Sequence, residues 1–131
     1  MRISIFGSGY VGLVQATVSA DVGHRVISMD IDAERVERLM RGEVPFFEPG
    51  LSEMIIRGVQ SGLHSFTTDT RTAVQSSDFL FICVGTPSRS DDSPDLQYIM
   101  SVADGIAQHI NGRKVIINKS TVPVGTADAV T

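Results

Sequence analysis

Residues 7–12, GSGYVG, have the spacing G-x-G-x-x-G and could bind a phosphate group. In this pattern the first glycine permits a tight turn, and the second lets the backbone approach a pyrophosphate. The third glycine allows a helix to pack closely on a strand. The free N–H groups and the positive end of that helix then favour an anion. The phosphate contacts expected from the motif are Gly7, Gly9, Tyr10 and Gly12.

Asp30 follows the second predicted strand, where a carboxylate can accept hydrogen bonds from both ribose hydroxyls of an adenosine. Its charge would repel a 2′-phosphate, which favours NAD over NADP. Arg35 works in the opposite direction, because a nearby basic side chain could bind that phosphate. No arginine directly follows Asp30, so NAD remains the expected cofactor. The first thirty residues do not separate NAD from FAD, or an enzyme from a module that only senses a nucleotide.

Apolar runs alternate with helical periods along the chain, which is typical of a parallel α/β sheet. Valines 11, 14, 18 and 22 recur every three or four residues and predict one face of a helix that Gly23 ends. Because crossovers between parallel strands are right-handed, the simplest fold is a Rossmann-type doubly wound sheet. We expect about five strands in the order 3-2-1-4-5, without the last strand of that fold. The strands are expected at 2–6, 25–29, 63–67, 79–84 and 115–117, and helices at 33–41, 52–59, 70–76, 96–110 and from 127 onward.

Two loops follow the fourth and fifth predicted strands, VGTP at 84–87 and KSTVPVGT at 119–126. Ligands of a doubly wound sheet bind outside the carboxyl ends of the strands, where both loops lie. Gly85, Thr86 and Thr121 are therefore candidates to line the nicotinamide-ribose side. Ordinary turns use the same residue types, so spacing alone leaves a purely structural role open.

Composition excludes several classes of protein. The 131 residues suffice for one domain with a core, but not for a complete two-domain dehydrogenase. Fifteen acidic against eleven basic residues give a net charge of −4, which argues against nucleic-acid or anionic membrane partners. No apolar run approaches the ~20 residues of a membrane span, and no signal peptide is evident. A cytoplasmic protein is expected.

Several residues are of types that can act in catalysis or metal binding, but their sequence context favours a structural role for most of them. Cys83 is the only cysteine, which excludes an internal disulfide, and its apolar run at 79–84 predicts a buried, inert thiol. No metal site is expected, because the three histidines stand apart. Phe46 and Phe47 are predicted to pack in the core, and Glu48 could begin a helix or face a substrate.

Several motifs together resemble the NAD-binding domain of the UDP-glucose/GDP-mannose dehydrogenase family. In the family's order they are FGSGYVGLV at 6–14, EPGL at 48–51, CVGTP at 83–87, DLQY at 95–98 and KSTVPVGTAD at 119–128. The glycine motif is shared with many dehydrogenases, whereas EPGL, CVGTP and KSTVPVGT together are restrictive. DLQY and STVPVGTAD are more similar to the UDP-glucose enzymes than to the GDP-mannose enzymes.

The resemblance implies an enzyme that oxidises the C6 alcohol of a UDP-sugar to a carboxylate in two hydride transfers to NAD⁺. It implies that Val11 packs on the cofactor, that Asp30 and Arg35 bind the adenosine ribose, and that Thr86 and Thr121 contact NAD. It also gives Thr121 a supporting catalytic role in orienting water.

The family's cysteine nucleophile belongs to a downstream motif that residues 1–131 lack. We therefore expect the chain to be the NAD-binding domain, without the central helix and the UDP-sugar-binding domain, and inactive alone. The full-length protein is expected to be a homodimer.

Overall fold

The computed structural model describes residues 1–120 and 125–131. Within these residues there are five strands and six helices, and each strand is followed by one helix except the second, which is followed by two. The strands are β1 (Arg2–Phe6), β2 (Arg25–Met29), β3 (His64–Thr67), β4 (Phe79–Ile82) and β5 (Val115–Asn118). The helices are α1 (Tyr10–Asp21), α2 (Ala33–Met40), α3 (Leu51–Ser61), α4 (Thr70–Gln75), α5 (Gln97–His109) and α6 (Thr126–Val130).

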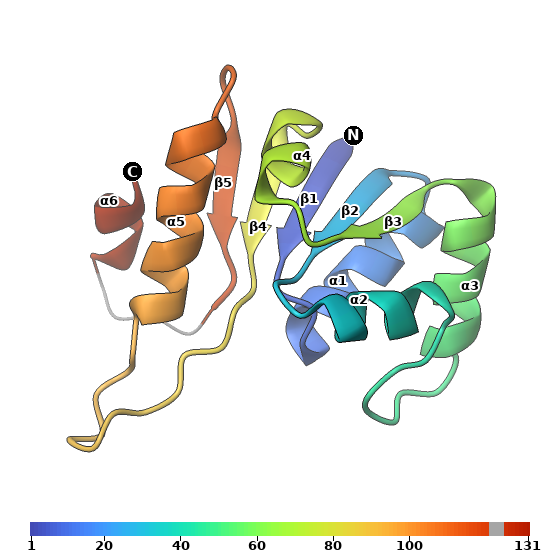
Figure 1. The fold of residues 1–131 in the computed structure, drawn as a ribbon, viewed down its shortest axis with the longest axis horizontal. Coiled ribbons are helices and arrows are strands. Elements are labelled where there is room, and N and C mark those ends of the chain that lie inside the picture. The colour runs from blue at the N-terminus through green and yellow to red at the C-terminus, as the bar shows by residue number, and fades with distance from the viewer. Residues whose placement is uncertain (121–124) are drawn as a thin grey trace.

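The five strands form one parallel sheet in the order β3-β2-β1-β4-β5 (Figure 1). In the central strand, Ile5 lies opposite Ser28 of β2 and Phe81 of β4. The fold class and strand order predicted from the sequence are therefore confirmed. Because all strands run the same way, the loops that follow them meet at one edge of the sheet.

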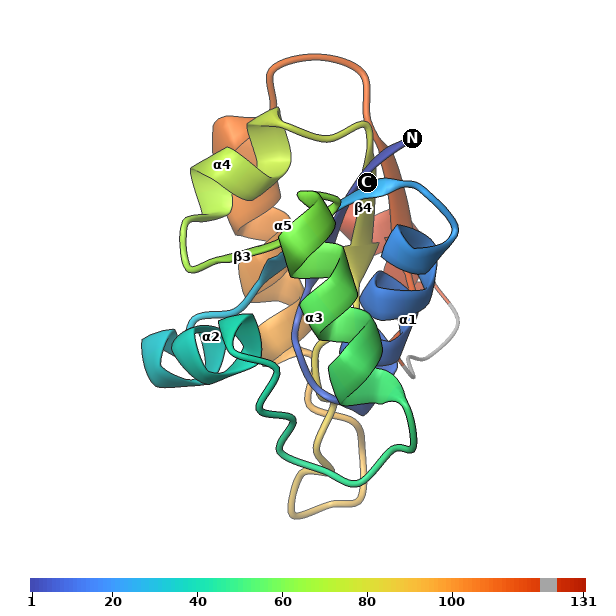
Figure 2. The same cartoon turned by 90° about the vertical axis from the view of Figure 1, so that its right-hand side faces the viewer.

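Helices cover both faces of the sheet (Figure 2). On one face, Ala16 and Ala20 of α1 pack with Ile5, and α3 lies beside α1. On the other face, Ile99 and Ile106 of α5 belong to the core that also contains α4. The carboxyl edge stays open between these layers.

Helix α1 packs on the sheet through small side chains rather than through its valines. Ala16 and Ala20 are buried, whereas Val11, Val18 and Val22 are 50%, 46% and 67% exposed. The predicted valine face is thus not the face that contacts the strands. Small residues let a helix approach a sheet closely. The regular spacing of the valines therefore did not identify the face of α1 that packs on the sheet.

The segment 43–50 connects α2 to α3 in an irregular conformation. Phe46 packs beside the cluster of α1, α2 and α3, as predicted, but Phe47 is 90% exposed and its predicted core position is wrong. Glu48 does not begin a helix, because α3 starts at Leu51 after Gly50, which has a φ of 82°. No helix in the described residues is long and apolar enough to cross a membrane.

Candidate dinucleotide-binding site

The predicted site residues meet at the carboxyl edge of the sheet. Each strand ladder continues one residue into the following loop, as in the hydrogen bonds from Gly7 N to Met29 O and from Cys83 N to Phe6 O. A crevice of about 270 Å³ opens there, and the cavities that adjoin it reach Asp30. The crevice is lined by Gly9, Tyr10, Val11, Cys83, Val84, Gly85, Thr86, Lys119 and Ser120.

The three glycines of the motif differ in their steric surroundings. Gly7 has a φ of 105°, and a Cβ added to it would lie 2.6 Å from the Cys83 carbonyl oxygen. A Cβ on Gly12 would collide with the Gly7 carbonyl oxygen. At Gly9, by contrast, a Cβ would meet nothing within 4 Å. Gly7 and Gly12 are thus required by the fold, whereas the space at Gly9 is free for a ligand.

Helix α1 begins at this open space. Its first internal hydrogen bond runs from Leu13 N to Gly9 O, so the preceding N–H groups of the first turn have no partner within the helix. Those groups and the positive end of the helix suit a pyrophosphate. The open space at Gly9 and the free donors beside it fit a dinucleotide's phosphates.

Asp30 is joined to the glycine turn by a compact set of hydrogen bonds. Its Oδ2 accepts from Ser8 N at 3.0 Å and from Ser8 Oγ, and its Oδ1 accepts from Asp32 N at 3.0 Å. Burial alone would raise the pKa of Asp30, but these hydrogen bonds and the Arg35 charge outweigh it and hold the pKa below its ordinary value. The carboxylate is therefore charged and fixed in direction.

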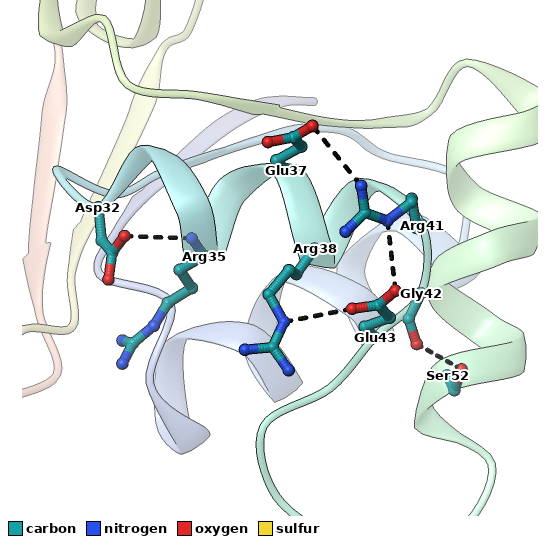
Figure 3. A network of polar contacts seen from close by, with 8 residues as sticks. All are labelled: Asp32, Arg35, Glu37, Arg38, Arg41, Gly42, Glu43 and Ser52. Atoms are coloured by element: carbon teal, nitrogen blue, oxygen red, sulfur yellow. Dashed lines mark hydrogen bonds and ion pairs between the residues drawn. The ribbon is translucent and has the colours of Figure 1, made fainter.

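Arg35 lies beside Asp30, with Nη1 3.8 Å from Asp30 Oδ2. Its position at this edge follows from the capping of α2, since Asp32 accepts a hydrogen bond from Arg35 N (Figure 3). The other two arginines of this network, Arg38 and Arg41, instead pair with Glu43. Arg35 is consequently the guanidinium that the network directs toward the Asp30 carboxylate.

Residues that directly follow β4 and β5 line the other side of the crevice. Gly85 and Thr86 line it, as predicted, and the Ser120 hydroxyl donates to the Val84 carbonyl at 2.9 Å. That bond ties the two loops together. Thr121 lies outside the described residues, so its predicted cofactor contact and catalytic role remain predictions.

Ser8, Lys119 and Tyr98 are among the site residues that were not predicted. Ser8 joins Asp30 to the turn, Lys119 lines the crevice and donates to Gln15, and Tyr98 lines an apolar pocket between Asp30 and α5. Ser8 and Lys119 stand inside motifs, which was the available signal. Tyr98 ends the DLQY motif, but its place beside Asp30 depends on how α5 packs on the sheet.

Cys83 borders the crevice but packs in the core, with 8% of its surface exposed. Burial raises the pKa of its thiol to about 11, against a smaller opposite effect of Lys119. The prediction that Cys83 is a core residue is confirmed. In residues 1–120 and 125–131, no group of three acidic, histidine or cysteine side chains could hold a metal ion.

A parallel sheet in this order, with a glycine turn at α1 and a fixed carboxylate after β2, defines a Rossmann-type dinucleotide-binding domain. The chain belongs to the UDP-glucose/GDP-mannose dehydrogenase family, whose NAD binding domain matches residues 1–131. This confirms the family and the cofactor that the motifs indicated.

Known relatives cover nearly the whole chain. UDP-glucose 6-dehydrogenase from Rhizobium meliloti (strain 1021) is 47% identical over 131 residues, which are 99% of this chain and 30% of the relative. GDP-mannose 6-dehydrogenase from Pseudomonas aeruginosa is 43% identical over 133 residues, again 99% and 30% of the two chains. A crystal structure of a ternary complex of GDP-mannose dehydrogenase from P. aeruginosa matches with a TM-score of 0.94 at 42% identity, over 99% of this chain and 30% of that chain. The chain thus spans less than a third of these relatives.

Proposed function

We propose that this chain binds NAD at the carboxyl edge of its sheet, with the pyrophosphate at the start of α1. The observation that carries this proposal is the pairing of Asp30 with the glycine turn through Ser8 N at 3.0 Å. It sets a fixed negative acceptor for ribose hydroxyls beside an open space for phosphate at Gly9. Arg35 supports the ribose end, and Val11, Gly85 and Thr86 line the crevice toward the nicotinamide end.

NAD supplies the hydride acceptor, and the chain's residues supply orientation and charge. The Asp30 carboxylate holds the adenosine end and disfavours a 2′-phosphate. The first-turn N–H groups of α1 neutralise part of the pyrophosphate charge. With both parts held, the nicotinamide end is confined to the side of the crevice formed by the loops after β4 and β5.

We infer that the full-length protein oxidises the C6 alcohol of a nucleotide sugar to a carboxylate, with UDP-glucose as the first candidate substrate. The 47% identity to a UDP-glucose 6-dehydrogenase supports it. GDP-mannose is the second candidate, because the identity to a GDP-mannose 6-dehydrogenase is 43%. Assays of the full-length protein with each nucleotide sugar, followed by NADH absorbance, separate the two candidates.

We also propose that residues 1–131 are a cofactor domain that does not turn over alone. The buried Cys83 thiol is unsuited to attack an aldehyde, and the family's nucleophile motif is not in this sequence. The sugar-binding domain, a homodimeric assembly and a cytoplasmic location belong to the same proposal for the full-length protein. NADH production by this chain with UDP-glucose, lost on Cys83→Ser, would contradict it.

Calorimetric titration of this chain with NAD⁺, and in parallel with FAD, tests the cofactor assignment. Saturable binding of NAD⁺ at one site, with no comparable binding of FAD, is the expected result. Tighter binding of FAD, or no binding of NAD⁺, would refute the assignment.

A further inference from the structure

The 43–50 segment presents alternate side chains to opposite sides. Val44 and Phe46 are half-buried and pack beside the cluster formed by α1, α2 and α3. Phe47 points away from the protein and is 90% exposed. Glu48, two residues after Phe46, is half-buried again. The alternation therefore places the half-buried Glu48 on the same side of the segment as the two apolar residues that anchor it.

Both ends of this segment are fixed by hydrogen bonds. Ser52 Oγ donates to the Gly42 carbonyl oxygen at 2.6 Å, which closes the base of the segment (Figure 3). Glu43 accepts from Arg38 at 3.2 Å and from Arg41 at 3.3 Å. With its base closed and prolines at positions 45 and 49, the segment has few alternative conformations. Glu48 is consequently held by a segment whose conformation is already fixed before a ligand binds.

Glu48 contacts Tyr10, the first residue of α1. The Tyr10 hydroxyl donates to Glu48 Oε2 at 3.0 Å, and the Tyr10 and Phe46 ring centroids lie 5.1 Å apart at a tilt of 55°. The hydrogen bond to the carboxylate raises the pKa of the Tyr10 phenol above its ordinary value. Ring and hydroxyl are thus both held by the 43–50 segment.

Tyr10 lies at the rim of the candidate site, next to the space proposed for the pyrophosphate. It directly follows Gly9, lines the crevice, and is 54% exposed. Gly9 and Tyr10 both line the open crevice, and apart from its chain neighbours a Cβ at Gly9 would meet no atom within 4 Å, so a Tyr10 ring released from Glu48 could move at the rim of the crevice. Binding of a dinucleotide would then have to order or displace that ring.

We propose that Glu48 is a positioning residue for cofactor binding, which acts by holding Tyr10 at the rim of the crevice. The proposal rests on the proposed NAD site. Glu48 does not touch the cofactor in this account. It keeps the start of α1 accessible, and it links the segment between α2 and α3 to the phosphate end of the site.

The affinity of this chain for NAD⁺, measured by calorimetry, tests the proposal. Glu48→Ala and Tyr10→Phe should each weaken binding about three- to tenfold, the range expected when one side chain must be ordered on binding. The double variant should be no weaker than either single variant, because both remove the same contact. Glu48→Gln retains an acceptor and should bind NAD⁺ as the wild type does. Glu53→Ala, an exposed glutamate in the first turn of α3, is the matched control and should leave the affinity unchanged.

Tyrosine fluorescence shows whether the contact exists in solution, independently of NAD. The chain has two tyrosines and no tryptophan, so Tyr98→Phe leaves Tyr10 as the only strong emitter. A carboxylate acceptor quenches a phenol, because it accepts the proton that the excited phenol releases. In that background, Glu48→Gln and Glu48→Ala should both increase the emission, whereas Glu53→Ala should not.

Different results overturn different parts of this account. If the wild type binds NAD⁺ and Glu48→Ala binds it equally well, the positioning role is wrong and the proposed function stands. Emission unchanged by both Glu48 substitutions would also overturn the positioning role. If the wild type does not bind NAD⁺, the proposed function fails and the inference fails with it.

Discussion

Replacing Asp30 by alanine removes the carboxylate that joins the glycine turn to the end of β2. The wild-type carboxylate accepts three hydrogen bonds, two from Ser8 and one from Asp32 N, and its side chain is 12% exposed. A hydrogen bond to a charged group contributes about 1.5–3 kcal/mol. Loss of the ribose contact should therefore weaken NAD⁺ binding roughly 10- to 150-fold. Loss of the Ser8 contacts adds to this effect by loosening the turn.

Calorimetry of the wild type, Asp30→Ala and Asp30→Asn measures this effect. The asparagine substitution would keep an oxygen for Ser8 but lose the charge, so an intermediate affinity is expected. Asp78→Ala is the matched control, because Asp78 pairs with Arg2 at 3.1 Å at the amino ends of the strands. Asp30→Ala with wild-type affinity and an unchanged melting temperature would refute the assigned role of Asp30.

Three further predictions concern the glycine turn, Cys83 and His64. Gly9→Ala should weaken NAD⁺ binding with little change in melting temperature. Gly7→Ala should clearly lower the melting temperature, because Gly7 has a φ of 105°. Equal melting curves of the two variants would contradict this difference. Cys83 should not react with a thiol reagent in the folded chain at pH 8, because burial raises the pKa of its thiol to about 11. It should react once the chain is unfolded. Rapid reaction of the folded chain would be inconsistent with its core position. Burial lowers the pKa of His64 from 6.5 to about 4, so the unfolded chain binds the proton first and stability falls as pH decreases from about 6.5 toward 4. The loss, about 3 kcal/mol, should shrink in His64→Gln; urea unfolding at several pH values checks this, and an unchanged pH dependence would show that other groups cause it.

The sheet could be predicted from the sequence because each strand carries its own local signal. The apolar run at 79–84 predicts the fourth strand, and the motif at 7–12 predicts the turn from the first strand into its crossover helix. The strand order then follows from the right-handedness of such crossovers. Asp30 and the glycines were also predictable, since their roles depend on position relative to a strand end. The structure places them at the carboxyl edge of the sheet, where Asp30 accepts from Ser8 N, and their contacts with a cofactor remain predictions.

The remaining features depend on contacts between distant segments. Val18 and Phe47 were expected on packed faces but are 46% and 90% exposed, because the helix and the connecting segment present other residues inward. Tyr98 lines the pocket beside Asp30 only because α5 crosses that edge of the sheet. The contact between Tyr10 and Glu48 joins residues 38 positions apart, and no local pattern encodes it.

We propose that this chain binds NAD through a charged Asp30 that disfavours a 2′-phosphate. Parallel calorimetric titrations with NAD⁺ and NADP⁺ test it most directly. We expect saturable NAD⁺ binding at one site and clearly weaker NADP⁺ binding. NADP⁺ binding as tight as or tighter than that of NAD⁺, or no binding of NAD⁺, would contradict it.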